Sequence, residues 1–168
     1  MGERAFDALI WLLVLGLAAG TLFWAGATEW KSQPVPFPHD KHVDFGIACE
    51  ACHVGAKDSV RATIPNVQTC AFCHVPGKAG PRTPGILEAH VRDMKPISWQ
   101  KLYQAPRHVT LSHKRHAASG KIECKACHGE IGKMEKALSR KPVPLSMDGC
   151  MDCHRREGVT TDCLACHR

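Results

Sequence analysis

The sequence predicts a mostly α-helical chain with extensive irregular structure and one N-terminal transmembrane helix. Three observations carry this prediction. Residues 8–27 form twenty consecutive positions without a charged side chain. The pattern Cys-x-x-Cys-His then occurs five times. The part of the chain from Trp30 onward offers only about 28 residues for each copy, too few to enclose an apolar core of ordinary size around each of them.

Each Cys-x-x-Cys-His copy has the form of a c-type haem attachment site, in which two thiols bind the porphyrin covalently and the next histidine binds the iron. Zinc is the alternative, because paired Cys-x-x-Cys units also make zinc sites. Zinc does not require a histidine directly after every second cysteine, so we predict five covalently bound haem c groups. The attachment residues are Cys49, Cys52, Cys70, Cys73, Cys124, Cys127, Cys150, Cys153, Cys163 and Cys166, and the proximal histidines are His53, His74, His128, His154 and His167.

The haems change how composition and charge are interpreted. With so little polypeptide per site, the porphyrins themselves are expected to form the core, in a stack covered by helical turns and loops. The formal charge of +6 would otherwise suggest an anionic partner. Haem propionates offset that charge and ferric irons restore part of it, so the oxidised protein is expected to be close to neutral. Nucleic acid is therefore not a predicted partner.

The N-terminal segment is long enough to cross a membrane. Residues 8–27 would span about 30 Å as a helix, the thickness of the bilayer hydrocarbon. A cleaved signal peptide is the alternative, since Ala25-Gly26-Ala27 resembles a cleavage site. The apolar run exceeds a usual signal core, so we favour a retained helix. Arg4 before it predicts a cytoplasmic N-terminus, with Trp24 and Trp30 near the outer interface of the bacterial inner membrane and the haem domain outside.

The remaining chain is organised as an internal duplication. His39-Asp40-Lys41-His42 precedes the first attachment motif by six residues, and His113-Lys114-Arg115-His116 precedes the third by seven. A Gly- and Pro-rich stretch at 77–85 separates the halves, and a short helix at 86–94 carries His90. We predict a stub and transmembrane helix at 1–29, a Pro-rich linker at 30–38, a dihaem module at 39–76, a linker with short helices at 77–107, and a trihaem module at 108–168.

Six histidines lie outside the attachment motifs and are candidate distal ligands: His39, His42, His90, His108, His113 and His116. Histidines three apart on a helical turn point in different directions, so each His-x-x-His pair can reach two irons. This arrangement resembles the class III cytochromes c, the cytochrome c7 and c3 group. The resemblance implies that His39 and His113 cap the haems at Cys49 and Cys124, and that His42 and His116 cap those at Cys70 and Cys150.

The sequence leaves the distal ligand of the fifth haem, at Cys163, undecided. In cytochrome c7 it is a histidine just before the preceding motif, and Met147 occupies that place here. A thioether can bind iron and raises the reduction potential, although Met147 could equally pack against a porphyrin. His108 and His90 are the alternatives. Of the three we favour Met147.

A longer resemblance covers residues 96–154. It includes Ile97-Ser98-Trp99, Pro106-x-x-Val109-x-x-Ser112-His113, and Leu145-Ser146-Met147-x-x-Cys150-x-Asp152. These motifs are similar to those of the membrane-anchored pentahaem cytochrome c subunit of bacterial alternative complex III. Tyr103 departs from this pattern, since many members have a histidine there, which could pass a ligand role to His108.

Membership of that family would imply an electron-transfer subunit of a quinol:electron-acceptor oxidoreductase, not catalytic by itself. Its partners would be polysulfide-reductase-type quinol-binding subunits, an iron–sulfur subunit and a monohaem cytochrome c. Menaquinol or ubiquinol would be oxidised in a partner and a periplasmic protein reduced. The alternatives are a stand-alone membrane-anchored quinol dehydrogenase and a multihaem reductase, which needs a haem with an open distal position.

Overall fold

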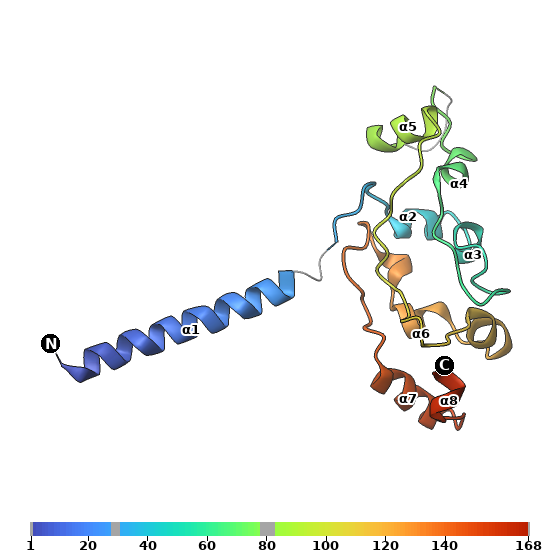
Figure 1. Cartoon of the computed structure of the whole chain (residues 1–168). Coiled ribbons are helices and arrows are strands. Elements are labelled where there is room, and N and C mark those ends of the chain that lie inside the picture. Colours follow the sequence, from blue (N-terminus) through green and yellow to red (C-terminus); the bar gives the residue numbers. More distant parts are fainter. Residues whose placement is uncertain (1, 28–30, 78–82, 168) are drawn as a thin grey trace.

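The computed structural model describes residues 2–27, 31–77 and 83–167 (Figure 1). These residues form short helices joined by long irregular segments, and the described part contains no β-strand. Its only β-type pairing is one isolated antiparallel bridge, between Val109 and His167. The predicted mostly helical and irregular fold is therefore confirmed. The boundary at Trp30 and most of the break at 77–85 lie outside the described residues.

The first helix, α1 (Glu3–Ala27), extends away from the rest of the chain (Figure 1). Its segment Phe6–Trp24 has a mean hydropathy of 2.0 and none of it is buried against the protein. Leu12, Leu17 and Leu22 all expose most of their side-chain surface. A helix that is apolar on every face needs an apolar surrounding. In length and composition α1 can cross a membrane.

The other helices are one to three turns long. They are α2 (His39–Asp44), α3 (Cys49–Cys52), α4 (Val67–Ala71), α5 (Gly85–Arg92), η1 (Lys114–Ser119), α6 (Cys124–His128), η2 (Ile131–Lys133), α7 (Met147–Arg156) and α8 (Cys163–Cys166). Isolated helices of this length are unstable in water, because nucleation costs more than so few hydrogen bonds return. Contacts with other parts of the molecule must hold them.

The helix η1 has π-helical hydrogen bonding, whereas its counterpart α2 in the first half is an α-helix. The second half has one residue more between its histidine pair and its attachment motif. A π-turn absorbs one extra residue without shifting the helix on either side of it. We infer that η1 accommodates this insertion.

The apolar core of the described chain is small and lies at one end. It consists of Val35, Val67, Leu87, Val91 and Ile97, with Trp99 packed against it. It joins the linker, α4, α5 and the segment after α5. The rest of the domain has no comparable cluster among the described residues, which is what a fold built around cofactors would require.

Asn66 ties this core together. Its side-chain oxygen accepts hydrogen bonds from Val67 N, at 2.8 Å, and from Ile97 N, at 3.0 Å. The first bond caps α4. The second holds the segment after α5 against it, and Trp99 Nε1 donates to Pro65 O nearby. Together these bonds fix α4, and hence the second attachment motif, to the core.

Backbone hydrogen bonds join the two halves of the duplication. His113 N donates to Val60 O at 3.0 Å, and Lys114 N donates to Ser59 O at 2.9 Å. On the other side, Asp40 N donates to Met134 O at 3.2 Å, which holds α2 against η2. The start of each histidine pair is thus anchored to the opposite half.

Candidate haem-binding sites

Each attachment motif begins on a short helix. Cys49, Cys124 and Cys163 are the first residues of α3, α6 and α8. Cys150 is the fourth residue of α7, and Cys70 lies in α4. Three of these helices have side-chain caps. Besides Asn66 at α4, Ser146 Oγ accepts from Gly149 N at the start of α7, and Asp162 Oδ1 accepts from Leu164 N at the start of α8. One helical turn places the two thiols of a motif on one side, with the histidine directly after them.

Three distal candidates face the proximal histidines predicted for them. The ring centroids of His42 and His74 lie 6.2 Å apart. Those of His113 and His128 lie 6.4 Å apart, and those of His116 and His154 lie 6.2 Å apart. The histidines of each pair come from different elements, so the pairing is produced by the fold and not by the local sequence.

This separation fits an iron between two imidazoles. A metal–imidazole bond of about 2 Å, with about 1.2 Å from nitrogen to ring centre on each side, places the two centroids about 6.4 Å apart. Direct ring stacking would bring them considerably closer, as for Phe37 and His42 at 4.3 Å. The donor set of two thiols and two opposed imidazoles therefore fits a six-coordinate c-type haem.

The fourth pair, His39 and His53, is less completely described. Burial, followed by the charges of His53 and His42, lowers the pKa of His39 to about 4. Its Nδ1 is buried without a hydrogen-bond partner among the described residues. A pKa this low keeps the imidazole neutral at pH 7, which is the form that binds a metal. The pairing of His39 with His53 stays a prediction, which the electrostatic influence of His53 on this pKa supports.

Hydrogen bonds at Nδ1 orient several of the other rings. This atom faces a backbone oxygen in His42, His53, His113, His116 and His154, the partners being Pro38, Thr63, Val60, Ser112 and Thr160. A carbonyl oxygen only accepts, so Nδ1 carries the proton and Nε2 keeps its lone pair. Second-shell bonds of this kind fix the tautomer and the orientation of metal-binding histidines. All five rings are thus prepared to bind iron through Nε2.

At the fifth site the structure brings His108 against His167. The two rings are nearly parallel and their centroids are 5.6 Å apart. The bridge between Val109 and His167 and the bond from Thr110 N to Cys166 O hold the residues after His108 beside the last motif. Met147, which the sequence favoured, is 62 % exposed at the start of α7. Of the three candidates, only His108 has a ring that faces His167 among the described residues, at a separation shorter than the value of about 6.4 Å worked out above.

His90 has no facing imidazole in the described part of the chain. It lies on α5, beside the small apolar core, and its Nδ1 faces Lys95 O at 2.9 Å. Four facing pairs, together with His39 and its predicted partner His53, account for the other ten histidines. The described geometry therefore gives no support to His90 as the ligand of the fifth haem.

Thiols of different motifs influence one another's pKa. Burial, and then the nearby Cys124, raise the pKa of Cys49. Burial and Cys73 do the same for Cys52, burial and then Cys153 for Cys127, and burial and then Cys166 for Cys150. A raised pKa keeps these thiols protonated, which argues against a nucleophilic role.

Zinc does not suit this arrangement. Among the described residues no group of three or more His, Cys, Asp or Glu side chains is gathered as a metal site. A structural zinc site requires four ligands converging on one point. The imidazoles here oppose each other in pairs, which fits the iron of a haem.

Sequence reasoning missed two aromatic residues that contact the ligand candidates. The ring of Phe37 stacks on His42 and meets His39 edge-on at 4.8 Å. Tyr103 meets His128 edge-on at 4.6 Å and donates to Val143 O at 2.9 Å. Phe37 lies two residues before the histidine pair, so its position in the sequence could have indicated these contacts. Tyr103 is distant in sequence from His128, so no local pattern could reveal its contact.

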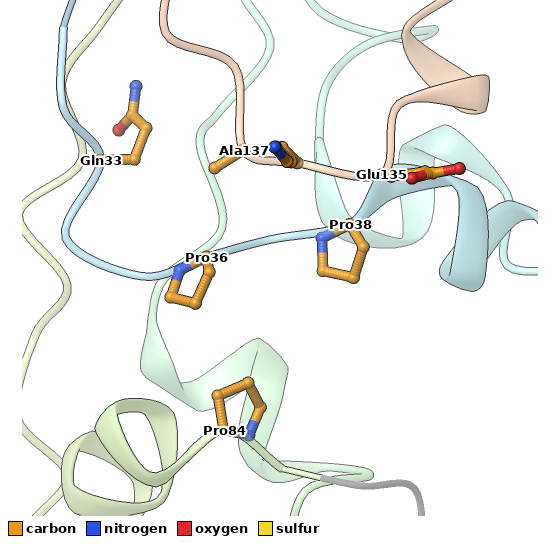
Figure 2. A pocket seen from close by; sticks show the side chains of 7 residues that line it. Gln33, Pro36, Pro38, Pro84, Glu135 and Ala137 are labelled. Atoms are coloured by element: carbon orange, nitrogen blue, oxygen red, sulfur yellow. The ribbon is translucent and has the colours of Figure 1, made fainter.

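One shallow hollow lies apart from the thiols and imidazoles. Figure 2 shows it between the linker, the start of α5 and residues 135–137, lined by Gln33, Pro36, Pro38, Pro84, Glu135, Lys136 and Ala137. Three prolines contribute much of its surface. Neither a cysteine nor a histidine lines it, and we assign it no redox role.

Attachment motifs with opposed imidazoles define a multihaem c-type cytochrome module. The comparison with known families agrees for the second half of the chain. Residues 109–168 match the family described as cytochrome c7 and related cytochrome c. This family implies covalently bound haem c and suggests electron transfer. No curated protein matches the chain.

Proposed function

We propose that this chain binds five haem c groups and relays single electrons as the cytochrome subunit of a membrane complex that oxidises quinol. The observation that carries the proposal is the opposition of imidazoles across the motifs, at 5.6 to 6.4 Å in four of them. The cysteines would hold each haem covalently. The haems supply the one-electron chemistry, and the protein supplies ligation, spacing and potential.

For the distal ligands we propose His39, His42, His113, His116 and His108, in that order paired with His53, His74, His128, His154 and His167. Such a set leaves each iron with two imidazoles. A reductase would need an iron with an accessible position for its substrate. Paired imidazoles therefore support an electron relay over a multihaem reductase.

The electrostatic influences between thiols of different motifs support a linear order of sites. The second site neighbours the first through Cys73 and Cys52, and the first neighbours the third through Cys49 and Cys124. The third then neighbours the fourth, and the fourth the fifth. In Figure 1, α4, α3 and α6 follow one another in this order, and α7 and α8 lie together beyond α6. We propose that electrons move along this line, whose ends are the sites at Cys70 and Cys163.

The anchor supports a place at the membrane. Since α1 can cross the bilayer once, we propose that it anchors the chain in the bacterial inner membrane with the haem domain on the periplasmic side. A single helix offers little room for a quinone pocket, so quinol oxidation would take place in polysulfide-reductase-type partner subunits. An iron–sulfur subunit and a monohaem cytochrome c complete the proposed complex.

Gentle purification of the tagged full chain from native membranes tests this function. We expect other membrane subunits to accompany it, and we expect added menaquinol or ubiquinol to reduce its haems in the complex but not in the isolated chain. Reduction of the isolated chain at the same rate would instead support a stand-alone quinol dehydrogenase. Substrate-linked reoxidation with nitrite or hydroxylamine would support a reductase.

A further inference from the structure

The proximal histidine of the third proposed site, His128, is held differently from those of the first, second and fourth sites. In each of those three histidines the Nδ1 atom faces an oxygen atom of the protein. Among the described residues His128 has no such partner, and two rings approach it instead. His113 lies nearly parallel to it at 6.4 Å, and Tyr103 meets it edge-on at 4.6 Å. Ring contacts therefore take the place of the hydrogen bond at this site.

The hydroxyl group of Tyr103 fixes the far end of its ring. This group donates to Val143 O at 2.9 Å and accepts from Val143 N at 3.4 Å. The segment that carries Val143 lies against Gly129, the residue directly after His128. A Cβ added to Gly129 would lie 3.3 Å from Pro142 Cβ and 3.3 Å from Val143 Cγ2. The phenol ring therefore connects the backbone at 142–143 with the imidazole at the end of α6.

Gln33 holds the backbone segment that carries Tyr103. Its side-chain oxygen accepts from Gln100 N at 3.0 Å, and its side-chain nitrogen donates to Gln100 O at 3.0 Å. The same nitrogen donates to Leu138 O at 2.9 Å, on the segment that leads to Val143. Figure 1 shows the chain after α5 running from that helix toward α6. Residues distant in the sequence thus set the position of Tyr103, and its contact with His128 is a product of the fold.

We propose that Tyr103 is the positioning residue of the third haem, and that its ring edge keeps the His128 imidazole parallel to that of His113. This rests on the proposed ligation of that haem by His113 and His128. The two imidazole planes lie within 8° of parallel. Neighbouring groups orient metal-binding histidines, usually through a hydrogen bond at the second ring nitrogen. At His128 an edge-to-face contact, which aromatic rings favour, serves the same purpose.

Electron paramagnetic resonance of the oxidised, full haem-loaded chain in detergent tests this role. The axial ligands set the electronic structure of a haem iron. Parallel imidazole planes give a rhombic low-spin signal, and planes turned away from each other give a signal with a larger maximal g-value. Tyr103→Leu removes the ring edge, so one signal, about one fifth of the low-spin intensity from five motifs, should move to a larger g-value. Tyr103→Phe keeps the ring but loses both bonds to Val143, and should move the same signal by a smaller amount.

Two further variants make the test specific. His113→Ala identifies the signal of the third haem, because that signal should leave the low-spin spectrum; if all five low-spin signals remain, the proposed ligation itself is contradicted. Phe37→Leu is the matched control, since Phe37 contacts the distal candidates of the first and second sites, and it should leave the third signal in place.

The role of Tyr103 is refuted if Tyr103→Leu leaves the third signal unchanged, or if it moves several signals together, as a general loosening of the fold would. Covalent haem content is measured first for each variant. Should Tyr103→Leu bind fewer than five haems, Tyr103→Phe decides the matter by the same criterion.

Discussion

The substitution His108→Ala tests which residue is the distal ligand of the fifth haem. The sequence favours Met147, whereas the structure favours His108. The centroids of His108 and His167 are 5.6 Å apart, with the rings nearly parallel. Removing the His108 imidazole should leave the fifth iron with one strong ligand. A ferric haem that loses one of two imidazoles changes from low spin to high spin, because the ligand field weakens.

The size of the effect follows from the number of sites. Five motifs with paired ligands should give a protein that is entirely low-spin when oxidised. The substitution should convert one site and leave four, so about one fifth of the low-spin intensity should become high-spin. The covalent attachment at Cys163 and Cys166 does not involve His108, so the haem content should not fall.

Electron paramagnetic resonance of the oxidised full chain measures this fraction, with Met147→Leu as the matched control. We expect Met147→Leu to keep every site low-spin and to leave the highest midpoint potential in place. If Met147→Leu creates the high-spin site and abolishes a weak sulfur-to-iron absorption band, whereas His108→Ala changes nothing, then Met147 is the ligand. The inference that the bridge between Val109 and His167 positions His108 as an iron ligand would then be wrong.

Three further outcomes follow from the structure. His90→Ala should leave the spectrum of the oxidised protein unchanged, and a new high-spin signal would show that His90 binds an iron. Asn66→Ala removes two hydrogen bonds and should lower the free energy of unfolding by roughly 2 kcal/mol, measured by denaturant titration followed by circular dichroism; an unchanged midpoint would contradict the role given to this cap. Gly55 has φ +86°, and an added Cβ would lie 2.6 Å from Arg61 O. Gly55→Ala should therefore destabilise the loop by more than about 1 kcal/mol. Equal stability of the variant in the same titration would contradict this prediction.

The sequence was informative where a short run of neighbouring residues determines the chemistry. The Cys-x-x-Cys-His pattern needs only five consecutive residues, and the apolar run at the N-terminus needs no partner to be recognised. Two features that followed from these patterns are confirmed, namely the mostly helical and irregular structure and an N-terminal helix long and apolar enough to cross a membrane. The pairing of His42 with His74, and of both histidines of the second pair, was inferred by resemblance and stays a prediction that the geometry supports.

The sequence could not predict which residues far apart along the chain lie close together in the fold. His108 reaches His167 because residues 109 and 110 bond to the last motif, and nothing near His108 in the sequence encodes that contact. Met147 was favoured because it occupies the place, just before the fourth motif, that holds a distal histidine in cytochrome c7. The order of the sites likewise depends on contacts between halves, such as those of Ser59 and Val60 with the start of η1. One inserted residue gave no sign that it would be absorbed by a π-turn.

The central claim is that every Cys-x-x-Cys-His motif holds a haem, and the intact mass of the purified chain tests it most directly. Five covalent haems should add about 3 kDa to the 18.4 kDa polypeptide, and the added mass should survive denaturation because thioether bonds hold it. A smaller addition corresponding to fewer haems, or a chain of unmodified mass that contains zinc, would contradict the account.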